Sequence, residues 1–500
     1  MQASARVVEK LHVPTTGAAT VGAGLPDAPP RRPRRRGPIP QRAIEVVGIL
    51  IGIGLVAGVA RGHDLSNDEF WSLAAGQWML AHHAFMGLDP FSYTESHRRW
   101  VTDEWGSEIA LATLFRAFGN LAYSLYAIVL GGLCLITTAA YARALGARGG
   151  RVVAIVLVLA AGIAGVAAGD RGLDFSLVWL PLELLLLTKA RGNPRWLFLL
   201  PLLCLFWVNT HGSILLGLLV LAVELGWSLV PERFVQRIGG VHQSPFTGSL
   251  ALALLGSVLA SCVTPYGPGL LAYDVAVSRN GQIAQYITEW NSPNFHSVTT
   301  LLIYCVPLAV FVLCIWTRRL PLLEISFGLL LFVEAMQTQR LAVYLLLVAA
   351  GAAATLPARG PWGTTARRWV GGGLVVLAIV VVALPAVPAG QVASSQPVAA
   401  FNDLNAHPGR VFTQYTWGDY SVARHRATFV DGRTDLFEGK VLTEFMAVTN
   451  LTTNPDPVLS ASHVDYVVWA PHTPLALYLA RDPRWHVVDR TSVALVFARR

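Results

Sequence analysis

About eleven apolar runs, most of them near the length that crosses a lipid bilayer, constrain what this chain can fold into more than any other feature. A run of roughly 20 apolar residues allows one helix to span the hydrocarbon core. The runs lie at 43–60, 121–142, 152–168, 173–190, 196–210, 213–230, 248–264, 298–316, 320–337, 341–357 and 369–388. The sequence therefore predicts a mainly α fold, a polytopic transmembrane helix bundle.

The composition excludes several other classes of protein. Hydrophobic residues make up 54% of the 500 residues and charged residues 14%, whereas a soluble chain carries about 25% charged residues. Such a chain cannot cover its surface with polar groups, and it is neither disordered, collagen-like nor a disulfide scaffold. The five cysteines have no metal-binding spacing and read as small core hydrophobes: Cys134, Cys204, Cys262, Cys305 and Cys314.

The positive charge is concentrated before the first apolar run. The first 42 residues hold eight Arg and Lys against two Asp and Glu, so they carry +6 of the net charge of +8. A basic segment beside a span sets membrane orientation, and no nucleic-acid partner is needed to explain it. Arginines recur in alternate loops, which places the N-terminus in the cytoplasm. An odd number of spans then places the C-terminus outside, in a multi-pass protein of the plasma membrane.

Three regions follow from this topology. Residues 1–42 are expected to form a disordered basic cytoplasmic tail, and 43–388 the transmembrane module, with a long first outer loop at 61–120 that contains amphipathic stretches at 70–79 and 108–118. Residues 389–500 have a soluble composition and predict a small extracytoplasmic α/β domain. Its expected strands are 410–415, 428–431, 465–470, 486–489 and 493–498, and its expected helices are 436–449 and 474–481.

Two acidic pairs in the first outer loop are candidates for chemistry. Asp68 and Glu69 precede Trp71, and Asp103 and Glu104 precede another tryptophan. A carboxylate at the outer membrane face can take a proton from an attacking hydroxyl, and a neighbouring aromatic ring can stack on a sugar. The alternative is structural, because acidic residues stabilise the N-terminus of a helix and tryptophan is common at membrane interfaces.

Other polar residues gather at the outer ends of the predicted spans. An arginine there can bind phosphate or extend toward the interface from a helix end. A histidine can act as an acid or base, or cap a carbonyl group, and a Tyr-Gly pair can form a turn. The candidates for substrate binding are Arg171, Asn209, His211, Tyr266, Glu289, Trp290 and Arg340.

The order of these motifs resembles a known family. The chain contains Asp68-Glu69-Phe70-Trp71-Ser72-Leu73, then Asp89-Pro90-Phe91-Ser92-Tyr93-Thr94, then Glu104-Trp105-Gly106-Ser107-Glu108. This pattern is similar to bacterial GT-C class membrane glycosyltransferases, in the branch related to protein mannosyltransferases and aminoarabinose transferases. The similarity continues through His211-Gly212-Ser213, Pro265-Tyr266-Gly267, Glu289-Trp290, Trp417-Gly418-Asp419-Tyr420 and Asp431-Gly432-Arg433. The chain departs from the branch pattern at Phe70 and Ser72, where Trp and His are expected.

The resemblance implies a function and roles for the candidate residues. The chain would transfer a sugar from a polyprenyl-phosphate donor to a glycan, lipid or protein acceptor at the outer membrane face, with inversion. Asp68 would be the general base, with Glu69 as its neighbour or substitute. Asp103 and Glu104 would orient the substrate or, with Asp68, hold a divalent cation (Mg²⁺ or Mn²⁺), which only some relatives need. The remaining candidates would bind substrate, Arg340 and Arg171 by holding the lipid-linked phosphate.

Two other functions stay open from the sequence. A lipid-linked glycan transporter or flippase would need a polar path through the bilayer, with cations at mid-depth, whereas the arginines here lie at the ends of the predicted spans. A non-catalytic cell-envelope assembly protein would have the two acidic pairs far apart in space.

Overall fold

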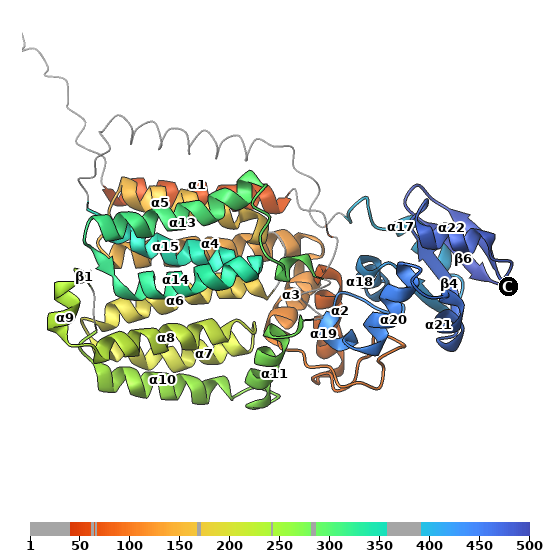
Figure 1. Ribbon diagram of the computed structural model, residues 1–500, viewed down its shortest axis with the longest axis horizontal. Helices are drawn as coiled ribbons and strands as arrows, with labels where there is room; N and C mark the ends of the chain where they lie inside the picture. The colour runs from red at the N-terminus through yellow and green to blue at the C-terminus, as the bar shows by residue number, and fades with distance from the viewer. Residues whose placement is uncertain are drawn as a thin grey trace, which may run out of the picture. The chain divides into compact units, whose positions relative to one another are not determined.

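The computed structural model describes residues 41–61, 65, 68–167, 172–241, 244–281, 287–357 and 392–500 (Figure 1). The predicted basic tail up to residue 40, the predicted span 369–388, the predicted domain boundary at 388/389 and Arg171 lie outside the described residues. The described residues from Gln41 onward belong to one compact unit.

The chain is mainly helical, and its long apolar helices coincide with the predicted spans. They are α1 (Gln41–Arg61), α4 (Leu121–Ala144), α5 (Gly150–Ala167), α6 (Leu173–Ala190), α8 (Ile214–Leu229), α10 (Thr247–Ser261), α13 (Val298–Trp316), α14 (Leu322–Gln337) and α15 (Ala342–Thr355). The run 196–210 instead divides into a 3-10 helix η1 (Pro194–Leu199) and α7 (Leu200–Val208). Pro201 lies in the first turn of α7, where a missing N–H is tolerated.

These helices pack side by side (Figure 1). Helix α1 packs on α4 and α5, α4 on α6, α10 on α7 and α8, and both α13 and α14 on α15. Within the described ranges, only α1, α4 and α13 are both long and apolar enough to cross a membrane by themselves. The other apolar helices are shorter or more polar, so the count of eleven spans stays a prediction.

Cysteine burial agrees with the sequence at most positions. All five cysteines are free, with Cys134, Cys204 and Cys314 buried and Cys262 half-buried. Cys305 of α13 is exposed, so its expected place in a core is wrong. Helix α13 carries several other exposed apolar side chains, among them Leu302 and Val312, and Cys305 shares this outward-facing environment.

The first outer loop contains the two expected helices, both longer than predicted. These are α2 (Asp68–His82) and α3 (Trp105–Phe118), which pack on each other. Gly76 of α2 lies directly against the backbone carbonyl of Glu108 in α3. No larger residue fits there, because a side chain would displace one helix from the other.

Residues 392–500 form a mixed sheet with helices. The sheet order is β3-β4-β6-β5. Strand β3 (Arg410–Thr413) is parallel to β4 (Val464–Trp469), and β6 (Leu495–Arg499) is antiparallel to both of its neighbours, β4 and β5 (Trp485–Arg490). The helices are α17 (Val398–Leu404), α18 (Tyr415–Ala423), α19 (Thr434–Phe437), α20 (Lys440–Thr449), α21 (Pro455–Ala461) and α22 (Pro474–Arg481).

Two predictions in this region are wrong in detail. Residues 428–431 do not form a strand, because Thr428 makes only isolated bridges, to Ser92 and to Val411. The predicted helix 436–449 is interrupted between α19 and α20 by Gly439, whose φ of 93° is a conformation that glycine adopts without strain.

The first outer loop and the C-terminal region share one hydrophobic core. Met79 and Trp100 of the loop belong to the same buried cluster as Phe412, Phe445 and Trp469 of the C-terminal region. Helix α18 also packs on α2, where the rings of Phe70 and Tyr420 meet edge to face at 5.3 Å. The C-terminal region is therefore packed onto the loop that carries the two acidic pairs.

Candidate functional site

The first acidic pair lies in the first turn of α2. Trp71 donates its indole N–H to Asp68 Oδ1 at 3.3 Å, which fixes the carboxylate against the aromatic side chain that follows it. Glu69 is buried, with 2% of its surface exposed. Acidic residues in this turn also favour the positive end of the helix dipole, so the local sequence accounts for the helix start as well as for the position of the carboxylates.

The C-terminal region brings a second carboxylate to Asp68. A methyl group on Gly432 would lie 2.8 Å from Asp419 Oδ1 and 3.0 Å from Asp68 Oδ1, so both carboxylates face the same small space. The Gly432 N–H donates to Asp419 Oδ1 at 2.6 Å. Burial, with the charges of Asp431 and Asp68, raises the pKa of Asp419 well above its ordinary value.

Arg433 joins the loop to the C-terminal region through a buried ion cluster. It pairs with Asp431 at 2.6 Å and with Asp89 at 2.6 Å, and its guanidinium lies 4.4 Å from the centre of the Trp100 ring. Burial lowers the pKa of Arg433, but the charges of Asp431 and Asp89 reverse this effect and raise it. A buried cluster of this kind is stable because the positive charge of Arg433 compensates the negative charges of Asp89 and Asp431.

The Asp89-to-Thr94 motif serves as a docking segment. The Asp89 carboxylate accepts backbone N–H bonds from Phe91 and Ser92, while the Tyr93 hydroxyl donates to the Val411 carbonyl at 3.0 Å. The Thr94 hydroxyl donates to the carbonyl of Phe429 at 2.6 Å. The motif therefore fixes the loop to the C-terminal region and leaves the acidic pairs as the candidates for chemistry.

The second acidic pair meets a histidine and an arginine from distant segments. Glu104 Oε1 lies 3.3 Å from His211 Nε2, and that same nitrogen lies 3.2 Å from an Arg340 guanidinium nitrogen. Burial, with the charge of Arg340, lowers the pKa of His211 well below its ordinary value. Burial therefore favours the neutral imidazole, whose Nε2 lies between a carboxylate and a guanidinium at the end of the helix bundle that carries loop 61–120.

The contacts of these residues differ from the purely structural alternatives. Glu104 occupies the N-cap position of α3 but makes no capping bond with its side chain. The other ring nitrogen of His211 bonds to the hydroxyls of Ser176 at 3.0 Å and Ser213 at 2.7 Å, not to a helix-end carbonyl. Arg340 lies 5.7 Å from the centre of the Trp290 ring, which holds its side chain over the bundle end.

Asn209 and Tyr266 hold the second acidic pair in position. Asn209 accepts the indole N–H of Trp105 at 2.9 Å, and its amide donates to the carbonyl of Leu205. The Tyr266 hydroxyl accepts the N–H of Thr102 at 3.0 Å. Both residues thus contact the chain immediately beside Asp103 and Glu104, so the structure places them as supports of the loop.

Asp103 faces a further pair of carboxylates. A methyl group on Gly212 would lie 2.9 Å from Asp274 Oδ1 and 3.4 Å from Asp103 Oδ2. Asp274 belongs to α11 (Gly269–Ser278), and the adjacent Tyr273 hydroxyl donates to Asp435. Burial raises the pKa of Asp103 well above its ordinary value, and the charges of Glu104, Asp274 and Asp435 add to this effect.

The raised pKa of Asp274 leads us to expect that the stability of the protein depends on pH. Burial, followed by the charge of Glu104, raises the pKa of Asp274 from 3.8 to about 7. The native state therefore binds the proton more tightly than the unfolded state, and this stabilisation is complete below about pH 3.8 and lost as the pH rises to about 7. We expect the melting temperature of the wild type to fall relative to that of Asp274→Asn across this range. Exposed Asp403→Asn is the control, and parallel melting curves for wild type and Asp274→Asn would contradict the prediction.

The structure brings some of the predicted residues together and separates others. Glu104 and Arg340 both contact His211, and Trp290 lies against Arg340. Asp68 instead faces Asp419, while Asp103 faces Asp274. Glu289 adjoins Trp290 in η2 (Thr288–Trp290), and Arg171 lies outside the described residues.

The sequence analysis assigns no site role to four acidic residues that the structure places here, namely Asp274, Asp419, Asp431 and Asp435. Two of them belong to motifs with a visible signal, because Gly418-Asp419 and Asp431-Gly432-Arg433 place a glycine beside a charged residue. Gly418 lies against the backbone carbonyl of Val430, which brings the two motifs together. Asp274 lies in an otherwise apolar helix, where a single carboxylate is the signal that could have identified it.

The predicted cation ligands do not form a metal site as they are arranged. Asp68 lies with Asp419, whereas Asp103 and Glu104 face Asp274 and His211. Across the described ranges, no three His, Cys, Asp or Glu side chains form a group that could hold a metal ion. We therefore derive no chemical step through a metal.

Comparisons with known proteins identify the fold. No protein-family model and no curated protein matches the sequence. Among solved structures, the archaeal oligosaccharyltransferase AglB from Archaeoglobus fulgidus, in complex with an inhibitory peptide and a dolichol-phosphate, matches with a TM-score of 0.59 and 12% identity. The match covers 86% of this chain and 69% of AglB. ArnT from Cupriavidus metallidurans bound to undecaprenyl phosphate matches with a TM-score of 0.54 and 16% identity, over 91% of this chain and 97% of ArnT. The chain thus has the GT-C fold expected from its outer-loop motifs.

Proposed function

We propose that this chain is an integral membrane glycosyltransferase that transfers a sugar from a polyprenyl-phosphate donor to an acceptor outside the cytoplasm. The fold supports this proposal, since one structural neighbour is bound to a dolichol-phosphate and another to undecaprenyl phosphate. The acceptor is a glycan, lipid or protein. In this proposal the protein is a multi-pass plasma membrane protein, with residues 389–500 on the extracytoplasmic side.

The contact between Glu104, His211 and Arg340 is the observation on which the proposal rests. These residues come from the first loop, from the turn between α7 and α8, and from the 3-10 helix η3 (Gln339–Leu341). Each lies at an end of a helix, and His211 Nε2 has the Glu104 carboxylate at 3.3 Å and the Arg340 guanidinium at 3.2 Å. A cation next to carboxylates at a bundle end suits a substrate whose phosphate stays beside the lipid.

Asp68 is the proposed general base. The acceptor hydroxyl attacks the anomeric carbon from the face opposite the phosphate, its proton passes to Asp68, and the bond between carbon and phosphate oxygen breaks to release polyprenyl phosphate. This single displacement inverts the anomeric centre. Two carboxylates that face one another do not both ionise easily, and the raised pKa of Asp419 makes Asp419 the partner that keeps its proton. Glu69 supports Asp68 as its buried neighbour.

Arg340 is the proposed ligand of the donor phosphate. A guanidinium forms paired hydrogen bonds with phosphate oxygens, and Arg340 is held in place by His211 and Trp290. Arg171 is the second candidate for this role. Asp103 and Glu104 orient the sugar, with Trp71, Trp290 and Glu289 available for further sugar contacts. In this proposal the C-terminal region closes the site over Asp68.

Replacing Arg340 by glutamine tests phosphate binding. A charge-assisted hydrogen bond contributes about 1.5–3 kcal/mol, so we expect the Kd for undecaprenyl phosphate to rise by about tenfold or more. Arg279→Gln is the matched control, because Arg279 is exposed and lies in the predicted outer loop between the runs 248–264 and 298–316. Titration of the purified chain with undecaprenyl phosphate, followed by native mass spectrometry, measures both variants.

Measurements of bound lipid and of lipid movement separate the proposed function from its alternatives. Mass spectrometry of lipid that copurifies with the wild type should detect a polyprenyl-phosphate sugar. Unchanged affinity in Arg340→Gln would remove Arg340 from the site. Movement of lipid-linked sugar across vesicles without any transfer would favour a flippase, and absence of any polyprenyl lipid would favour an assembly protein.

A further inference from the structure

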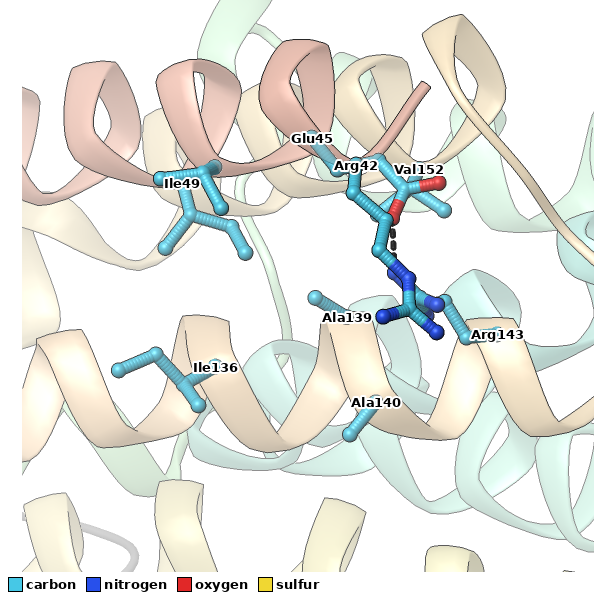
Figure 2. Close-up of a pocket in the computed structure, with 9 residues that line it drawn as sticks. Arg42, Glu45, Ile49, Ile136, Ala139, Ala140, Arg143 and Val152 are labelled. Carbon is cyan, nitrogen blue, oxygen red and sulfur yellow. Dashed lines mark hydrogen bonds and ion pairs between the residues drawn. The ribbon is translucent and has the colours of Figure 1, made fainter. Parts of the chain in front are cut away.

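A pocket lies between α1 and α4, at the end of α1 that begins with Gln41 (Figure 2). Its volume is about 300 Å³. Helix α1 contributes Arg42, Glu45 and Val46 to its lining, and α4 contributes Ile136, Ala139 and Arg143. The small side chain of Ala139 leaves space between the two helices, and the polar residues gather at one end of the pocket.

The polar end of this pocket carries a net positive charge. Glu45 is buried, and both of its carboxylate oxygens have partners. One forms an ion pair with Arg143, and the other accepts the Gly149 N–H at 2.6 Å. Arg42 is exposed and forms no hydrogen bond or ion pair with any residue of the described ranges. Figure 2 shows both arginine side chains extending toward the same end of the pocket. Two guanidinium groups and one carboxylate leave one positive charge for an anion.

The other end of the pocket is apolar and open to the surroundings. Val46 is 54% exposed and Ile136 is 47% exposed. Helices α1 and α4 are both long and apolar enough to span a membrane, so their exposed apolar side chains face lipid. An occupant of this pocket must therefore combine an anionic group with a hydrocarbon chain.

The pocket is distant from the proposed transfer site. Helix α1 has 21 residues between Gln41 and Arg61, and a rise of 1.5 Å per residue makes it about 30 Å long. Asp68 follows the opposite end of this helix. The pocket thus lies at the other membrane face, and the proposed donor phosphate beside Arg340 does not occupy it.

We propose that this pocket binds an anionic glycerophospholipid from the leaflet in which α1 begins, which is the cytoplasmic leaflet in the predicted topology. The phosphodiester lies between Arg42 and Arg143, where guanidinium groups donate to its oxygens. The first carbons of an acyl chain lie along Val46 and Ile136. The lipid is held by charge and apolar contact together, so neither a zwitterionic lipid nor a free phosphate ester binds equally well.

The test uses the full chain reconstituted in vesicles of equal parts phosphatidylglycerol and phosphatidylcholine. After extraction in 0.5 M salt, which suppresses weak attraction to the basic tail, native mass spectrometry counts the retained lipids. We expect phosphatidylglycerol to be retained preferentially by the wild type. Because one Arg near a membrane contributes about 1 kcal/mol toward anionic lipid, Arg42→Gln should lower its retention about fivefold. Arg61→Gln, at the opposite end of the same helix, should not change it.

A second arm distinguishes a lipid from a simple phosphate ester. Soluble glycerophosphoglycerol carries the same headgroup without acyl chains, and it should fail to displace phosphatidylglycerol from the wild type. Displacement would overturn the lipid assignment. Equal retention of the two lipids, or equal loss in Arg42→Gln and Arg61→Gln, would overturn the site itself. None of these outcomes depends on transfer activity, so they leave the proposed function unaffected.

Discussion

Replacing Asp68 by asparagine should reduce sugar transfer by about 10²–10⁴-fold, the range that a positioned general base contributes. Asparagine keeps the size of the side chain and an oxygen that can accept the indole N–H of Trp71, so the fold is retained while the base is lost. Membranes that contain the variant are supplied with polyprenyl-phosphate sugars, and the release of polyprenyl phosphate is measured. Transfer at the wild-type rate would remove Asp68 from the base role.

Asp419→Asn is the matched control for this experiment. Asp419 faces the same space as Asp68, and burial holds its pKa well above the ordinary value. If Asp419 carries its proton, asparagine resembles the native group and still accepts the Gly432 N–H through its Oδ1. We therefore expect Asp419→Asn to retain most of the activity. An equal loss in both variants would show that the two carboxylates act as one unit and that the base cannot be assigned to Asp68 alone.

Replacing Arg433 by methionine should destabilise the protein by about 3–5 kcal/mol, the usual effect of removing one partner from a buried ion pair. The variant leaves Asp89 and Asp431 buried without their cation, although methionine preserves the apolar contact with Trp100. Because the pair with Asp89 joins the outer loop to the C-terminal region, we expect a lower melting temperature in detergent and faster proteolysis at this contact.

Two further variants isolate the charge effect from the loss of the side chain. Exposed Arg481→Met in α22 should leave the melting temperature unchanged. The triple variant Arg433→Met with Asp89→Asn and Asp431→Asn removes every charge of the cluster, so it should recover part of the lost stability. A triple variant less stable than Arg433→Met would contradict the electrostatic explanation.

Hydropathy was sufficient to predict the bundle, but not the ends of its helices. A span such as α4 needs a continuous apolar run, and the sequence shows this directly. The prediction for the run 196–210 is less accurate, because the run divides into a 3-10 helix and a short α-helix that has Pro201 in its first turn. Residues 428–431 have the composition of a strand, yet Thr428 bridges two separate segments. Whether such a segment forms one regular element depends on its tertiary contacts, and local composition does not encode these contacts.

The sequence predicts at which membrane face the site residues lie, but not which of them contact one another. The sequence predicts Glu104 in the first outer loop and His211 and Arg340 at the outer ends of spans, so the predicted topology places all three at one face. Which carboxylate faces Asp68 depends on how residues 392–500 pack on α2. Asp435 belongs to a region with ordinary soluble composition, where acidic residues are common, and the motif around Asp419 does not indicate which residue Asp419 faces. The close approach at Gly432 distinguishes Asp419 from surface residues, and the hydrogen bond from Tyr273 distinguishes Asp435.

The ion pair between Asp89 and Arg433 joins residues 344 positions apart in the chain. During synthesis, the loop that carries Asp68 emerges early, and its partner segment emerges only after the last membrane helices have been made. A nascent chain that stalls before this point has its acidic pairs but lacks Asp419, Gly432 and Arg433. Such a product could not form the space in which Asp68 faces Asp419, because this arrangement requires the C-terminal region to have been made.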